Sequence, residues 1–437
     1  MAFKLFVLYL SMVFLRPIDQ LAPDLMDLRP MSILWAIAFA AAINDWVQSK
    51  IFAAATIHIK LLITFWITIV VSLLTNGLFG DAVSAIGEFS TPAMLLILSS
   101  LNITSVKRMR TVCAALVCCI TVLCAESLYS YHTGFLIDKL VIKQVAREDV
   151  EVSQLIELPA QDIDGVYLWR LRSVGFLSDP NDFAQAICMV MPWLLLGHES
   201  RRHLKNAIFI VAPAALMGYA ALLTHSRGGM IGLGVLGFVQ LVRRLGTLWG
   251  FALGGIAGAA FAVVAQVGGR GFSGKEASAN ERLDAWYEGL EMFKHSPIFG
   301  VGYGHFEDHH IRTAHNSFVL CFAELGSFGY ICWLALIVLA FKAAYSATSA
   351  KSIDDQSLGW AMTASLSAFL ACSWFLSRSY QPSLFMLFGL CFATGFATTS
   401  YANKSVGENE TLKWIRPTLV LYIVSIVGVS LFVRSAK

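Results

Sequence analysis

Long apolar runs alternate with short polar segments along most of the chain. A helix needs roughly 20 mostly apolar residues to cross the hydrocarbon core of a bilayer, which is about 30 Å thick. About thirteen runs approach this length, and the two nearest the N-terminus are short. The runs cover residues 5–15, 33–42, 61–74, 93–101, 112–128, 183–196, 207–223, 230–242, 248–267, 317–341, 360–376, 384–398 and 418–433. The pattern predicts an all-α, polytopic integral membrane protein with about 12–13 transmembrane helices, forming a single membrane domain over residues 1–437.

The composition agrees with a membrane protein. Of the 437 residues, 57% are hydrophobic and 14% are charged, and the mean hydropathy is +0.66. Soluble domains carry about 25% charged residues, so the composition argues against a soluble domain. The net charge of +3 gives no reason to expect a nucleic-acid partner. All nine cysteines fall within apolar runs, where we expect small buried side chains and neither disulfides nor metal ligands.

Basic residues gather in short loops at 105–110, 198–205, 241–246, 341–352 and 401–416. These loops fall at every second gap between the predicted spans. Because lysine and arginine in short loops mark the cytoplasmic side of a membrane, we assign these five loops to that side. The remaining loops then face outward, among them 129–172 and the largest, 268–316. The C-terminus also faces outward in this topology.

The largest outer loop contains a predicted amphipathic helix over about residues 281–295. Leu283, Trp286, Leu290 and Phe293 recur at helical spacing, and Asn280 stands where a helix N-cap is expected. An amphipathic helix with Trp and Phe on its apolar face typically lies in the membrane interface. Such a helix either acts as a strut or lid or covers a lipid-linked substrate.

The segment "GVGYGHFEDHH" follows this helix. Its glycines resemble a phosphate-binding loop only weakly, so we interpret the segment as a turn whose backbone N–H groups could approach an anion. His305, His309 and His310, with two neighbouring carboxylates, are the best candidates for a metal site. They lie in a loop without a helix to fix their geometry, so we expect a solvated loop and no metal.

Four arginines stand near the outer ends of predicted spans or in the largest outer loop: Arg227, Arg270, Arg282 and Arg378. A single arginine at such a place commonly extends to phospholipid headgroups. Several arginines on one face suit a second task, the bidentate binding of a pyrophosphate. The glycines beside Arg227 and Arg270 would leave room for such a group.

His315 and Asn316 begin a predicted span on the same outer face. A histidine there either caps the helix or acts as a general base that takes the proton from an attacking sugar hydroxyl. Asn316 would orient it, and a helix N-terminus would favour the neutral imidazole. Glu324 lies about two and a half turns deeper in the span. We expect a structural hydrogen bond for this carboxyl group, not catalysis.

These pieces, taken in order, resemble the O-antigen ligase/O-antigen polymerase superfamily of bacterial inner-membrane proteins. The matching stretches are "HSRGGMIGL", "ERLDAWYEGLEMFKHSPIFGVGYGHF" and "HNSFVLCFAELGSFGY", which lie within residues 224–330. Weaker similarity extends to "DPNDFAQ" and to "LRP" near the N-terminus. The resemblance implies a membrane glycosyltransferase of the GT-C type in the inner membrane, with its active site facing the periplasm and with neither a cofactor nor a metal.

In such enzymes a glycan passes from undecaprenyl pyrophosphate to an acceptor, which can be lipid A-core, another lipid-linked glycan or a protein. By motif, the resemblance gives Arg227 a pyrophosphate-binding role and His315 the place near the acceptor. Arg270, Arg282 and Arg378 are assigned by position alone. The alternatives are a flippase or other transporter of lipid-linked glycans and a membrane scaffold. We rank the enzyme first, because the polar residues gather at one face and internal repeats are not visible.

Overall fold

The computed structural model describes residues 1–21, 24, 28, 30–49, 56–145, 158–161, 167–199, 201–246, 277–398 and 413–436. Within these ranges, seven helices are long and apolar enough to cross a membrane, and three shorter apolar helices accompany them. The seven are Ile57–Thr75, Phe79–Asn102, Val106–Thr133, His203–Leu223, Arg227–Gly246, Ser317–Ala347 and Ile415–Ala436. The predicted span 248–267 lies outside the described residues. The predicted class, an all-α polytopic membrane protein, is confirmed.

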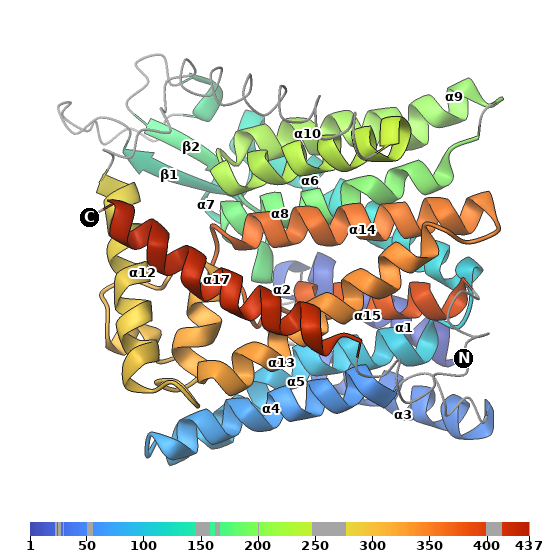
Figure 1. Ribbon diagram of the computed structural model, residues 1–437. Helices are drawn as coiled ribbons and strands as arrows, with labels where there is room; N and C mark the ends of the chain where they lie inside the picture. The colour runs from blue at the N-terminus through green and yellow to red at the C-terminus, as the bar shows by residue number, and fades with distance from the viewer. Residues whose placement is uncertain are drawn as a thin grey trace. The chain divides into compact units, whose positions relative to one another are not determined.

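The chain divides into two compact units, each described here by itself. The first comprises residues 1–45, 107–236 and 364–372. Its elements are α1 (Ala2–Leu15), α2 (Pro17–Leu21), most of α3 (Pro30–Ser49) and of α6 (Val106–Thr133), α7 (Ile137–Leu140), β1 (Val141–Val145), η2 (Pro159–Gln161), β2 (Tyr167–Leu171), η3 (Gly175–Leu177), α8 (Pro180–Val190), η4 (Met191–Gly197), α9 (His203–Asn206), η5 (Ala207–Val211), α10 (Ala212–Leu223) and the start of the helix Arg227–Gly246 (Figure 1).

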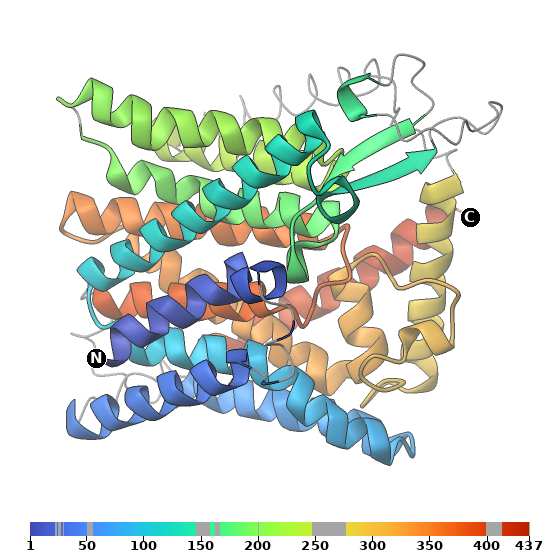
Figure 2. The ribbon, with the colours of Figure 1, turned by 180° about the vertical axis from the view of Figure 1, so that it is seen from behind.

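A two-stranded antiparallel sheet forms inside the predicted outer loop 129–172. Strands β1 and β2 pair from Val141↔Leu171 to Val145↔Tyr167, and the teal strands are seen from behind in Figure 2. The Lys143 ammonium lies 3.6 Å from the centre of the Tyr167 ring, a cation–π contact across the pair. The sequence predicts only a loop here, because two five-residue strands are a weak signal in a chain dominated by apolar helices.

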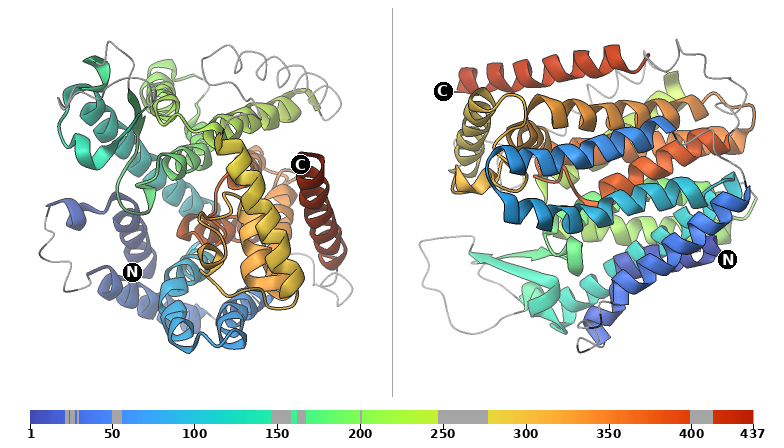
Figure 3. Two further views of the ribbon diagram at one scale, coloured as in Figure 1. Left: turned by 90° about the vertical axis from the view of Figure 1, so that its left-hand side faces the viewer. Right: turned by 90° about the horizontal axis from the view of Figure 1, so that it is seen from below.

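The second unit comprises residues 46–106, 237–363 and 373–437. Its elements are α4 (Thr56–Thr75), α5 (Phe79–Asn102), α12 (Ala277–His295), η6 (Phe306–Asp308), α13 (Ser317–Ala347), α14 (Ile353–Ser373, of which 364–372 belong to the first unit), α15 (Pro382–Ala397) and α17 (Ile415–Ala436). Helix α13 is the centre of the unit, since it contacts α4, α12, α15 and α17. Helix α12 runs across the direction of α13 and α17, as both Figure 1 and the left panel of Figure 3 show.

Helix α13 is broken at Gly326, where the backbone turns to φ 61° and ψ −163°. The segment 297–302 replaces the lost intrahelical bonds. Val301 N donates to Ala323 O at 3.0 Å, Gly302 N to Glu324 O at 3.0 Å, Ser327 N to Pro297 O at 2.8 Å and Phe328 N to Ile298 O at 3.2 Å. A break inside an apolar span is tolerated only where protein groups satisfy the freed backbone, and here the loop after α12 does so.

Glycine is required on both sides of this contact. Gly300 has φ +72°, and a Cβ atom there would lie 2.3 Å from the backbone carbon of Glu324. At Gly326 a Cβ atom would lie 2.4 Å from the backbone carbon of Ile298. The predicted turn at "GVGYG" is therefore present, and the first of its glycines allows close packing of two backbones.

Candidate active site

Asn316 fixes the start of α13. Its backbone is extended, and its Oδ1 accepts hydrogen bonds from Phe318 N at 2.9 Å and Val319 N at 3.2 Å. This is the N-cap geometry that asparagine favours, because the side chain satisfies N–H groups that have no partner within the helix. Asn316 is fully buried. Its Nδ2 atom has no hydrogen-bond partner in the part of the chain that the structure describes.

His315, directly before this cap, has a left-handed backbone with φ 49°. A residue with a Cβ atom rarely adopts this conformation, and such residues gather at functional sites. His315 is half-buried. A second histidine repeats the arrangement in the first unit: His225 has φ 48° and precedes Ser226, whose Oγ accepts from Gly229 N at 3.1 Å. Each of these histidines thus lies directly before the capping residue of a long helix.

Two side chains from other elements hold the residues just before His315. The Trp286 indole on α12 donates from Nε1 to the carbonyl oxygen of Ala314 at 2.9 Å. Thr313 Oγ1 donates to Ser377 Oγ at 2.8 Å. The carbonyl of the residue preceding His315 is therefore tied to the predicted amphipathic helix, which the structure extends to Ala277–His295.

Arg378 lies beside the first turn of α13. Its backbone N donates to Ser317 Oγ at 2.8 Å, and Ser317 Oγ donates in turn to Leu376 O at 2.5 Å. Ser379 Oγ donates to Ser317 O at 2.6 Å. The buried Ser317 is thus bound on both sides by the segment that follows α14. Arg378 and His315, 63 positions apart in the sequence, are brought to the same end of α13.

Arg282 lies one helical turn before Trp286 on α12, so it is placed near the same end of α13. A further arginine lies at this end of α13, and the sequence did not predict it as a site residue. Arg312, three positions before His315, forms an ion pair with Glu281 of α12 at 2.6 Å. The carboxylate of Glu281 is the one signal for this ion pair in the sequence, since it attracts a cation. Arg270 lies outside the described residues.

Arg227 belongs to the first unit, at the start of the helix Arg227–Gly246. The two glycines that follow it pack closely. A Cβ atom at Gly229 would lie 2.6 Å from Ala184 Cβ on α8, and the thiol of Cys372 donates to Gly228 O at 3.3 Å. The glycines therefore let α8 and its neighbours approach the turn that carries Arg227.

Arg170 on β2 also reaches this turn. Its Nε donates to Thr224 O at 3.0 Å and its NH2 group to Asn181 Oδ1 at 3.1 Å. Asn181 is in the first turn of α8, where Asp179 accepts from its backbone N at 2.7 Å as the N-cap. One guanidinium thus joins the strand, the "DPND" segment and the residue three positions before Arg227. Arg170 lies in the predicted outer loop 129–172, and no local sequence pattern marks it as part of a site.

The remaining polar residues of the loop after α12 have local partners. His305 Nδ1 lies 2.6 Å from an Asp308 carboxylate oxygen, and His305 Nε2 lies 3.5 Å from Asp81. Phe306 N donates to Glu324 Oε1 at 3.3 Å, which confirms the predicted structural hydrogen bond of this buried carboxyl group. Burial raises the pKa of the Tyr303 phenol, and nearby carboxylates add to the effect, so this hydroxyl is neutral.

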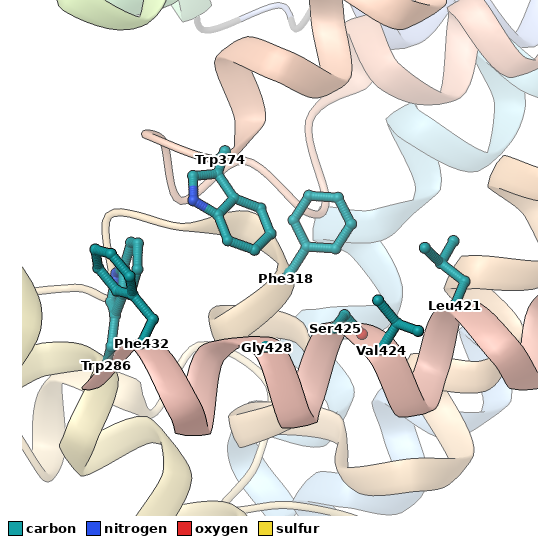
Figure 4. A pocket seen from close by; sticks show the side chains of 8 residues that line it. All are labelled: Trp286, Phe318, Trp374, Leu421, Val424, Ser425, Gly428 and Phe432. Carbon is teal, nitrogen blue, oxygen red and sulfur yellow. The ribbon is translucent and has the colours of Figure 1, made fainter. Parts of the chain in front are cut away.

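An apolar cavity of about 410 Å³ lies next to these elements (Figure 4). Its walls come from α12, from the first turn of α13, from the segment after α14 and from α17. The lining residues are Trp286, Phe318, Trp374, Leu421, Val424, Ser425, Gly428 and Phe432. The cavity therefore adjoins the same segments that carry Arg282, His315 and Arg378.

No curated protein matches the chain. A family model described as O-antigen ligase, Wzy_C, matches residues 212–334, which is less than a third of the chain. The matched stretch runs from the first residue of α10 into α13 and includes Arg227, Arg282, His315 and Asn316. Residues 212–334 are therefore similar to the O-antigen ligase family, which supports the predicted resemblance to the O-antigen ligase/polymerase superfamily.

Proposed function

We propose that the protein transfers a glycan from undecaprenyl pyrophosphate to an acceptor at the periplasmic face of the inner membrane. The family match implies an O-antigen ligase-type glycosyltransferase. The main support for this specific reaction is the position of His315. It has a strained backbone directly before a buried N-cap, within the matched domain, and two candidate pyrophosphate-binding arginines lie on segments bonded to its neighbours.

The reaction assigned to this site is a displacement at the anomeric carbon of the donor. The acceptor hydroxyl oxygen forms a bond to that carbon, and the bond from the carbon to the pyrophosphate oxygen breaks. The electron pair of the broken bond leaves with undecaprenyl pyrophosphate. His315 takes the hydroxyl proton as general base. Asn316 acts by capping α13, which holds the backbone on which His315 stands.

The arginines stabilise the charge on the leaving pyrophosphate. A guanidinium offers planar pairs of N–H donors that match phosphate oxygens, and it stays charged at any physiological pH. We assign this role to Arg227, Arg282 and Arg378, and to Arg270 by its position in the sequence. Since the growing negative charge lies on the leaving group, these side chains stabilise the transition state more than the bound donor.

The test is a transfer assay with purified protein and an undecaprenyl-pyrophosphate-linked glycan. Lipid A-core, a second lipid-linked glycan and an acceptor protein are supplied in separate reactions, and released undecaprenyl pyrophosphate is measured. Release that depends on one acceptor, and that His315→Ala abolishes, is the expected result and identifies the acceptor class. Release in none of the reactions would contradict the proposal.

A transporter of lipid-linked glycans is the second candidate, because α13 is broken at Gly326 beside the buried Glu324. Interrupted helices and intramembrane carboxylates mark the binding sites of many transporters. Reconstituted vesicles separate the two functions. Movement of the lipid-linked glycan across the bilayer without any transfer to an acceptor favours the transporter, whereas transfer without movement favours the enzyme.

A further inference from the structure

The cavity in Figure 4 is lined almost entirely by carbon. Of its lining residues only Ser425 carries a hydroxyl group, and that group is already used: it accepts from the Tyr330 hydroxyl at 2.7 Å and donates to Tyr422 O at 3.0 Å. The other polar groups of the walls are the indole N–H groups of Trp286 and Trp374, and that of Trp286 donates to Ala314 O. The lining therefore suits a hydrocarbon.

Large aromatic rings that touch one another form one end of the cavity. The ring centres of Trp286 and Trp374 are 5.9 Å apart, those of Trp286 and Phe432 5.7 Å, and those of Phe318 and Trp374 5.3 Å. The Trp286 indole is fixed by its bond to Ala314 O. Because aromatic side chains have few rotatable bonds and pack in preferred geometries, these walls keep their shape when a ligand is absent.

Three of the four walls of the cavity are close in sequence to a proposed site residue. Trp286 is one turn after Arg282 on α12, Phe318 is three positions after His315, and Trp374 is four positions before Arg378. The fourth wall is α17, which is largely exposed. Only 17% of the most apolar 18-residue stretch of this helix is buried, and Val424 and Phe432 are more than half exposed. The cavity thus lies between the N-terminal end of α13, near which Arg282 and Arg378 are found, and the apolar surface of α17, which suits contact with lipid.

We infer that this cavity binds the part of the polyprenyl chain nearest the pyrophosphate of the lipid-linked donor. This inference rests on the proposed function. A pyrophosphate-linked lipid needs cations and a dry apolar cavity next to each other, and Arg282 and Arg378 lie on segments that also supply cavity walls. Because the chain leaves one apolar medium for another, the cavity gains little from the hydrophobic effect. It acts through packing that sets the position of the pyrophosphate.

Gly428 allows the cavity to be filled without moving the backbone, since a Cβ atom there would meet no atom within 4 Å. The test variant is Gly428→Leu. Gly87→Leu in α5 is the matched control, because Gly87 also has open space and does not line the cavity. Transfer is measured with two donors that carry the same glycan pyrophosphate, one on the full undecaprenyl chain and one on a single isoprene unit.

We expect Gly428→Leu to raise KM for the full-length donor by about tenfold, the effect of a misfitting group in an apolar pocket. Its kinetics with the one-isoprene donor should match those of the parent protein, and Gly87→Leu should behave like the parent with both. Equal effects on the two donors, or no effect on either, would overturn the inference. If the parent protein transfers glycan from neither donor, the proposed function has failed, and the cavity is judged by labelling alone.

The labelling uses undecaprenyl phosphate with a photoreactive diazirine on its second isoprene unit. Adducts should map to α12 and α17, should persist in excess phospholipid and should be lost in Gly428→Leu. Adducts spread evenly over all lipid-exposed helices, or unchanged in Gly428→Leu, would show that the chain binds elsewhere whatever the protein catalyses.

Discussion

The guanidinium of Arg170 donates from Nε to the carbonyl oxygen of Thr224 at 3.0 Å, and thereby supports the turn that carries Arg227. A second bond, to Asn181 Oδ1, ties the same group to α8. If Arg227 binds the donor as proposed, Arg170 is a positioning residue, since it acts on that site through the backbone of Thr224. The role depends on two donors at fixed directions on one side chain.

Arg170→Lys should therefore lower kcat for transfer by about tenfold or more, because hydrogen bonds from a charged donor contribute about 1.5–3 kcal/mol and lysine cannot make both. The KM for the donor should change less, since Arg227 acts mainly on the charge that grows in the transition state. Steady-state kinetics in detergent check this. Arg172→Lys is the control: Arg172 follows β2 directly, but it donates to Asp138 O at the exposed surface. Equal kinetics for the two variants would remove Arg170 from the site.

Arg227 is tested by the same substitution, arginine to lysine. If it grips the pyrophosphate through a planar pair of N–H donors, Arg227→Lys should lose transfer nearly as fully as Arg227→Ala, since a point charge does not reproduce that geometry. Transfer rates are compared at equal amounts of folded protein. Full activity of the lysine variant would reduce Arg227 to a contact with lipid headgroups.

The break in α13 predicts a graded response to alanine. Gly300 and Gly304 both have positive φ, but only at Gly300 would a Cβ atom strike the backbone of α13. Gly304→Ala should cost about 1–2 kcal/mol, the penalty of a left-handed residue. Gly300→Ala should cost about 1–3 kcal/mol more, as overpacking does. Thermal unfolding in detergent measures both, and equal losses would mean that the contact with α13 is unimportant.

The topology is tested by cysteine labelling in intact cells. The basic loops predict that 268–316 faces the periplasm and that 198–205 faces the cytoplasm. Ile311 and Leu204 are both highly exposed, at 95% and 75%. Ile311→Cys should react with a membrane-impermeant thiol reagent, and Leu204→Cys should react only after the cells are opened. The parent protein gives the background of its own cysteines. The reverse pattern would place His315 on the wrong side for a periplasmic reaction.

Local sequence signals anticipated much of this structure. Helical spacing of apolar residues placed the amphipathic helix at about 281–295, and the structure has it at Ala277–His295. The polar pair His315–Asn316 marked the start of α13 correctly, because an N-cap acts on backbone groups two and three positions away. A single sequence therefore predicts best those features that depend on residues close together along the chain.

Features made by distant segments were missed for the same reason. The break at Gly326 becomes tolerable only through hydrogen bonds from residues 297–302. Arg170 gains its role from Thr224, 54 positions away. The cavity needs Trp286 and Phe432 to meet, although each by itself is an ordinary apolar residue of a helix. No spacing rule along the chain reports such contacts.

His315 is the proposed general base of the transfer reaction, and replacing its imidazole tests that role. His315→Ala should still bind the lipid-linked donor but lose about 10²–10⁴-fold in the rate of transfer, the usual contribution of a general base. His309→Ala and His310→Ala, at the exposed loop, should keep the rate. In the parent protein the rate should fall as the pH is lowered, because protonation removes the neutral imidazole that accepts the proton. Full transfer by His315→Ala, at unchanged donor binding, would contradict the account.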